Sequence, residues 1–226
     1  MFIKNIDDWK DCPNPSKALN IWMKNFRKFD ENWSPLPFTV KYQRLLSDRR
    51  DKYCPSQDRP ENFSFIHQNV LFISVHVIGQ EYKKYDKERL TRHEDAAIWL
   101  KKSIRRSCRD GIQAVVVFTH KGYKREKMYS DVFQPLIELY DEMYEEYHRI
   151  LPMIVIHGNG HQYEVGNPFR RENMLDLQVD QGRKGEPLKV TIDLDFFPYQ
   201  VKKMKDYKKK KRGVQYFQMF EFDRRL

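Results

Sequence analysis

Two stretches of the chain decide its fold, Ala114-Val115-Val116-Val117-Phe118-Thr119-His120 and Pro152-Met153-Ile154-Val155-Ile156-His157-Gly158-Asn159-Gly160-His161. Each is a short, β-branched apolar run that ends in a histidine near glycine. This pattern predicts a buried strand with an imidazole at its carboxyl end. Ligands of α/β sheets bind at that edge, where the loops converge. The matched pair therefore predicts a metal or phosphate site, and the alternative is two polar strand ends that face water.

Helical patterns precede both of these strands. The first covers residues 94–109 and ends at Asp110-Gly111, and the second covers residues 130–150 and ends at Leu151-Pro152. Glycine just after a helix, and proline just beyond it, are the usual stop signals. The order helix, strand, helix, strand predicts a right-handed crossover and a parallel pair of strands in an α/β domain.

Four further strands are predicted around this unit, as two hairpins. The turn of the first hairpin is Gln68-Asn69, whose two residues suit a tight connection between extended runs. The second hairpin is predicted from a glycine-containing segment at residues 181–185. The strands of the two hairpins are 62–66 with 70–77, and 173–179 with 188–194.

The composition favours a packed domain. The chain has 226 residues, of which 40% are hydrophobic and 14% aromatic, so a substantial core is expected. Its apolar runs are shorter than the roughly 18–20 residues that span a bilayer. Neither a signal peptide nor a paired-cysteine motif is visible. We expect an intracellular protein, cytoplasmic or nuclear, without a transmembrane segment.

The net charge of +10 is concentrated near the carboxyl end. The run Lys202–Arg212 holds eight basic residues and one acidic residue, which account for +7 of the total. We therefore expect a near-neutral domain over residues 1–198 and a basic tail over residues 199–226. Such a run is typical of a solvated charged stretch, and it also suits contact with nucleic acid or another anionic surface.

The order of elements from Phe63 to Leu194 resembles the carboxyl-terminal part of a calcineurin-like metallophosphoesterase. The resemblance implies a β-sandwich flanked by helices and a two-metal centre that cleaves phosphate esters. His120 matches the family's metal-binding histidine after a strand. The segment that includes Asn159 and His161 resembles the family's Gly-His-x-His motif, with His161 as the second histidine and Asn159 in place of the first. A neutral amide is a weaker ligand than imidazole for zinc or iron.

The amino-terminal side of the family pattern is incomplete in this sequence. The family's Asp-x-His and Gly-Asp-x-x-Asp motifs have no counterpart, and Lys4-Asn5-Ile6-Asp7-Asp8-Trp9 looks like a worn form of its third motif. One register places Asn5 among the metal ligands, and a shifted register brings in Asp7 or Asp8 instead. The missing motifs supply the carboxylate that bridges the two ions. We therefore expect one divalent ion, manganese, iron or zinc, rather than two.

Two functions follow from this resemblance. The first is a metal-dependent hydrolase of phosphate mono- or diesters with a reduced site, in which His120, Asn159, His161 and Asn5 or Asp7 bind the metal. In this hypothesis His157 is the candidate proton donor. The alternative is an inactive relative that has kept the scaffold as a binding or interaction module, with the basic tail extending its contacts. The missing motifs are explained by a truncated relative, a start that is placed too late, or a scaffold with another use.

Overall fold

The computed structural model describes residues 17, 21, 24–25, 37–44, 58–77, 86–123, 130–147, 151–158, 160–171, 173–180, 185–195 and 219–224. Within these ranges the elements, in chain order, are β1 (Lys41–Gln43), β2 (Arg59–His67), β3 (Val70–Ser74), α3 (Asp86–Arg109), β4 (Ala114–Phe118), α4 (Ser130–Tyr147), β5 (Met153–His157), β6 (Glu164–Gly166), β7 (Met174–Gln178), β8 (Lys189–Ile192) and β9 (Phe220–Asp223).

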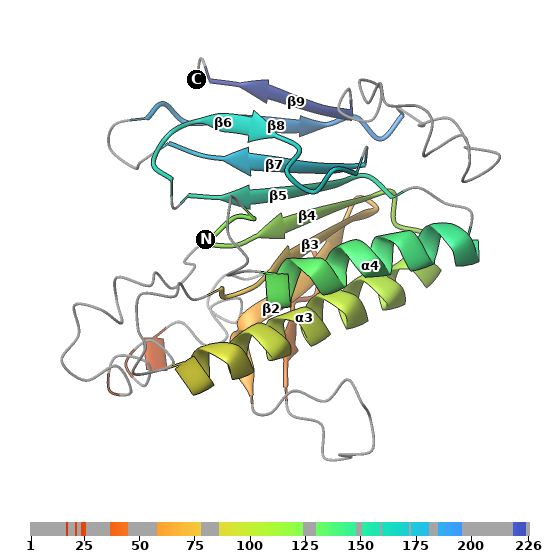
Figure 1. Ribbon diagram of the computed structural model, residues 1–226. Helices are drawn as coiled ribbons and strands as arrows, with labels where there is room; N and C mark the ends of the chain where they lie inside the picture. Colours follow the sequence, from red (N-terminus) through yellow and green to blue (C-terminus); the bar gives the residue numbers. More distant parts are fainter. Residues whose placement is uncertain are drawn as a thin grey trace.

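A mixed seven-stranded sheet forms the centre of the molecule, in the order β1-β2-β3-β4-β5-β7-β6 (Figure 1). Strands β3, β4, β5 and β7 are parallel to one another, and β1, β2 and β6 add antiparallel neighbours at the two sides. The predicted α/β class and the parallel pairing of the two histidine strands are confirmed. Their carboxyl ends therefore lie at one edge of the sheet.

Local signals explain the ends of several elements. Gln68 and Asn69 both have positive φ, 46° and 60°, and join β2 to β3 as the predicted tight hairpin turn. Gly111 follows α3 with φ of 76°, the left-handed conformation that ends many helices. Helix α3 begins at Asp86, whereas the sequence pattern predicted a start at residue 94. The first two turns were missed because they are mainly polar and lack the apolar periodicity that predicts a helix.

Alternate residues of the sheet face two separate hydrophobic clusters. Helices α3 and α4 lie side by side over one face, where Val115, Val117 and Val155 point into the larger cluster (Figure 1). On the other face, Val116 and Ile154 belong to a smaller cluster that residues from β8 and β9 complete. Because both faces are covered, the central strands are apolar throughout, as expected for buried parallel strands.

The second predicted hairpin is wrong. Strand β7 pairs with β5 and β6, whereas β8 pairs with β9 in a separate two-stranded sheet. Both edges of β7 are therefore paired inside the large sheet, and its apolar side chains face both clusters. Strand β9 falls within residues 199–226, and its Phe220 is buried. The end of the chain therefore contributes to the core, while the run Lys202–Arg212 lies outside the described residues.

Within the described ranges, no helix is both long enough and apolar enough to cross a membrane.

Candidate functional site

The carboxyl edge of the parallel strands brings the two predicted histidine segments together. Phe118 of β4 lies opposite Ile156 of β5, and the Thr119 amide donates to the Ile156 carbonyl at 3.0 Å beyond the last paired residues. His120 therefore follows directly from the paired end of β4, at the level of Gly158 on the neighbouring strand. His120 is half-buried at this edge.

His161 is held close to the same strand end by a tight turn. Its amide donates to the Gly158 carbonyl at 3.4 Å, and its φ of 57° lies in the left-handed region, which is uncommon for residues other than glycine. His161 is an exposed residue. Residues in this conformation persist where the surrounding structure fixes them, and they are enriched at ligand sites.

The loop that carries His161 is anchored to β7. The Gln178 side-chain amide donates to the Gln162 carbonyl at 2.6 Å. Gly160 lies so close to Gln178 that a Cβ at this position would overlap the side chain. On the other side, Asp180 accepts a hydrogen bond from the Tyr163 amide at 2.8 Å. One contact with the last residue of β7 and one with Asp180, two residues beyond it, therefore hold the turn, and with it the backbone of His161.

Strand β9 reaches the same loop through Arg224. This guanidinium contacts Asp180 at 2.6 Å and lies 4.5 Å from the centre of the Tyr163 ring. The pair is partly exposed, so its net contribution to stability is small, about 0–1 kcal/mol. Arg224 links the loop to the second sheet, and no local sequence pattern predicts this contact.

His157 occupies a different position from the other two histidines. Its side chain is only 2% exposed, and its Nε2 lies 2.9 Å from an Asp176 oxygen on β7. It points to the helix side of the sheet, like Val155 two residues earlier. Gly122 approaches its ring so closely that a Cβ there would overlap the imidazole. This burial favours a positioning role over exchange of a proton with a substrate.

The His157–Asp176 pair lies under the loops of the site. A carboxylate that hydrogen-bonds an imidazole fixes its tautomer and orientation. Within the described part of the chain, His157 Nδ1 and Asp176 Oδ1 have no hydrogen-bond partner, although both atoms are buried. Sequence reasoning missed Asp176. The available signal was an acidic residue inside the apolar strand Met174-Leu175-Asp176-Leu177, where a lone carboxylate needs a buried partner.

Further buried polar groups lie where β2 and α3 begin, beside the ends of β3 and β4. Arg59 contacts Asp95 at 2.8 Å, and both side chains are 2% exposed. Arg92 pairs with Glu61 in the same layer. His76, just after β3, donates its amide to Asn62 Oδ1 at 2.8 Å. These contacts fix α3 against the sheet. His76 is buried, and because Ser74 of β3 pairs with Phe118 of β4, it lies at the level of His120 on the neighbouring strand.

His93 and Asp131 join the amino-terminal parts of α3 and α4. His93 is fully buried, and its Nδ1 lies 2.9 Å from Asp131. Burial alone raises the pKa of Asp131, but the His93 hydrogen bond, its charge and that of Arg89 outweigh this effect. The pKa of Asp131 is therefore lower than its ordinary value of 3.8.

The remaining predicted ligands, Asn5, Asp7 and Asn159, lie outside the described residues. Across the described ranges, no cluster of three or more histidine, cysteine or acidic side chains is arranged to hold a metal ion. Of the predicted metal ligands, these ranges supply His120 and His161 at the carboxyl edge, where the buried His76 and His157 also lie. Imidazole is a good ligand for zinc, iron and other transition metals, so the side chains of His120 and His161 have the chemistry that the predicted metal site requires.

Comparison of the chain with models of known protein families, with curated proteins and with solved structures found no match.

Proposed function

We propose that the chain is a metal-dependent, phosphoesterase-like hydrolase of phosphate mono- or diesters, with its site at the carboxyl edge of the sheet. One observation carries the proposal: parallel β4 and β5 end at the same level, and a braced turn adds His161 beside the loop of His120. The packing of β8 and β9 on the second face also supports a metallophosphoesterase-like arrangement of two sheets. Manganese, iron or zinc suits these ligands.

The proposed shell consists of His120 and His161, completed by Asn159 and by Asn5 or Asp7. A divalent ion bound there would act as a Lewis acid that polarises a phosphoryl oxygen. The chain's own contribution is to present the imidazoles on loops that the sheet holds in place. The His157–Asp176 pair supports those loops from below, through the close approach of Gly122 to the His157 ring.

The test is hydrolysis of p-nitrophenyl phosphate and bis(p-nitrophenyl) phosphate by chain reconstituted with manganese, iron or zinc in turn. His120→Ala and His161→Ala should each reduce the rate by at least about tenfold and weaken metal binding, because each removes a ligand from a small shell. His67→Ala is the matched control. His67 pairs with Val70, at the amino end of the parallel strands, so the rate of hydrolysis and the affinity for metal should both be unchanged.

Two outcomes contradict the proposal. Equal rates in His161→Ala and the unmodified chain would place hydrolysis elsewhere. A folded chain that binds no metal and cleaves neither ester would instead favour the inactive interaction module. In that case, binding of an RNA or DNA oligonucleotide that requires Lys202–Arg212 and weakens steeply with salt would identify an anionic partner.

A further inference from the structure

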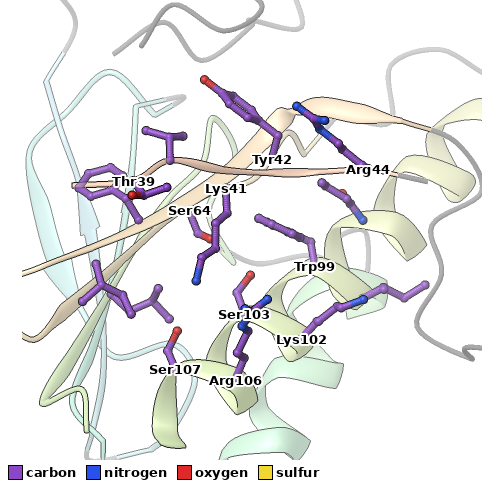
Figure 2. A pocket seen from close by; sticks show the side chains of 16 residues that line it. Thr39, Lys41, Tyr42, Arg44, Ser64, Trp99, Lys102, Ser103, Arg106 and Ser107 are labelled. Atoms are coloured by element: carbon purple, nitrogen blue, oxygen red, sulfur yellow. The ribbon is translucent and has the colours of Figure 1, made fainter. Parts of the chain in front are cut away.

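A cavity of about 590 Å³ lies between β1–β2 and the carboxyl-terminal half of α3 (Figure 2). Lys41 of β1 is opposite Ser64 of β2, and Leu71, near the start of β3, forms part of the wall. The lining comes from β1, β2, the start of β3 and α3, whereas His120 and His161 follow β4 and β5. The cavity is therefore separate from the candidate hydrolase site.

A hydrogen bond between β1 and α3 bounds the cavity at one end. Gln43 Nε2 donates to the Asp95 carbonyl at 2.7 Å, which brings that end of β1 against the helix. Lys41, two residues earlier, points to the same side of the sheet. Figure 2 shows Lys41 reaching toward the part of α3 that carries Ser103, Arg106 and Ser107.

The inner wall of the cavity is apolar with a few hydroxyl groups. Trp99 and Leu71 are 8% and 1% exposed, and both belong to the core that supports α3. The hydroxyl-bearing residues Ser64, Ser103 and Ser107 are also buried. Such a wall accommodates a hydrocarbon or aromatic group and provides hydrogen bonds at fixed points. Its volume is within the roughly 300–1,000 Å³ typical of small-molecule sites.

The charged residues in the described lining of the cavity are all basic. Lys41, Arg44, Lys102 and Arg106 contribute four basic side chains, and none of the sixteen described residues that line it is aspartate or glutamate. Lys41, Arg44 and Arg106 are exposed residues, so their charges lie toward the rim while the apolar wall lies inside. A ligand that matches both parts carries an anionic head on an apolar body.

We propose that this cavity binds a small amphipathic anion, in which an alkyl or aryl body packs on Trp99 and Leu71. Its carboxylate or phosphate-type head meets Lys41 and Arg106 at the rim. Guanidinium and ammonium groups are the usual partners of such heads. A bare anion makes no contact with the apolar wall, and a neutral alkyl chain forms no ion pair with Lys41 or Arg106. The match therefore requires both parts in one molecule.

Calorimetric titration of the full chain with octylphosphonate tests this site. The probe has no ester bond to cleave, and EDTA in the buffer removes any metal, so the result is independent of the hydrolase proposal. Octylphosphonate should bind at least about tenfold more tightly than methylphosphonate, which lacks the apolar body, or octanol, which lacks the charge. Equal binding of either fragment, or no binding of octylphosphonate, would overturn the proposal.

Charge variants identify where the probe binds. Lys41→Glu combined with Arg106→Glu should weaken octylphosphonate binding by at least about tenfold, because two attractions become repulsions at exposed positions. Lys101→Glu, on the same helix but outside the cavity wall, is the matched control and should leave affinity unchanged. Lys41→Met removes one charge without adding another and should give an intermediate loss. Equal affinity in all variants would place the probe elsewhere.

Discussion

Two regions of the central sheet differ in how their charged side chains are arranged. Near the carboxyl edge, acidic and basic groups are buried together, as in the Arg59–Asp95 pair and the His157–Asp176 pair. Between β1 and α3, basic side chains surround a cavity whose described lining holds no carboxylate. Paired buried groups fix the positions of strands and loops, whereas charges of one sign around a cavity favour a ligand of the opposite sign. Polar groups that stabilise the fold can therefore be distinguished from polar groups that are available to bind a ligand.

The largest effect is expected at the Arg59–Asp95 pair. Asp95→Ala leaves the guanidinium of Arg59 buried without its carboxylate, which should lower the free energy of unfolding by about 3–5 kcal/mol. Urea denaturation followed by circular dichroism measures this loss. Arg105→Ala is the control, since Arg105 and Glu142 are 41% and 54% exposed and their pair should contribute about 0–1 kcal/mol. Similar losses in both variants would remove the distinction between buried and exposed pairs.

A smaller but more specific effect is expected at Gly122. Gly122→Ala places a methyl group against the His157 ring, so the loop after β4 must shift, at a cost of about 1–3 kcal/mol. The same shift should weaken metal binding by moving His120. Gly166→Ala is the control, because its nearest neighbour to the new Cβ is a Pro168 carbon at 3.9 Å. Unchanged stability and metal affinity in Gly122→Ala would separate the His157–Asp176 pair from the site.

The His93–Asp131 contact predicts a change in acid stability. The folded-state pKa of Asp131 is lowered by His93 and Arg89 against the opposing effect of burial, so its stabilisation is present above pH 3.8. That stabilisation is lost as the pH falls through the lower, folded-state value. Asp131→Asn should therefore flatten the decline in melting temperature below about pH 4. A variant with the same acid profile as the unmodified chain would contradict this assignment.

The smallest effect is expected at Tyr140, in the hydrophobic cluster that α3 and α4 cover. Its hydroxyl is buried without a hydrogen-bond partner in the described part of the chain, so Tyr140→Phe should be neutral or stabilising by about 1 kcal/mol. Burial, with a smaller contribution from Cys108, raises the pKa of Tyr140 well above 10.0. Unfolded tyrosine ionises first, so stability should fall above pH 10 and fall less steeply in Tyr140→Phe. A destabilised variant would reveal a missed partner.

Much of the fold was predictable because it depends on local patterns. Apolar runs located β4 and β5, and Gln68-Asn69 and Gly111 marked a turn and a helix end. The partner of β7 was not predictable in the same way. A glycine-containing connection to the next strand suggested a hairpin, but pairing depends on which edges remain open in the whole sheet.

The candidate site shows the same limit. Strand-end histidines could be found from the sequence, because the ends of neighbouring parallel strands converge on one edge. Asp176 could not be assigned to His157 without knowing that β5 and β7 are neighbours. The basic cavity arises between β1 and α3, which are far apart in the sequence, and each reads alone as an ordinary charged surface. The basic residues of β1 and α3 therefore predict a binding site only once the fold shows that these elements are neighbours.

Metal content per chain is the most direct test of the central claim, that the carboxyl edge is a metal site of a phosphoesterase-like hydrolase. The measurement is elemental analysis of untagged chain, purified without chelators and then incubated with manganese or zinc. We expect about one ion per chain, reduced to near zero in His120→Ala and His161→Ala and retained in His67→Ala. No bound ion in the unmodified, folded chain would contradict the account.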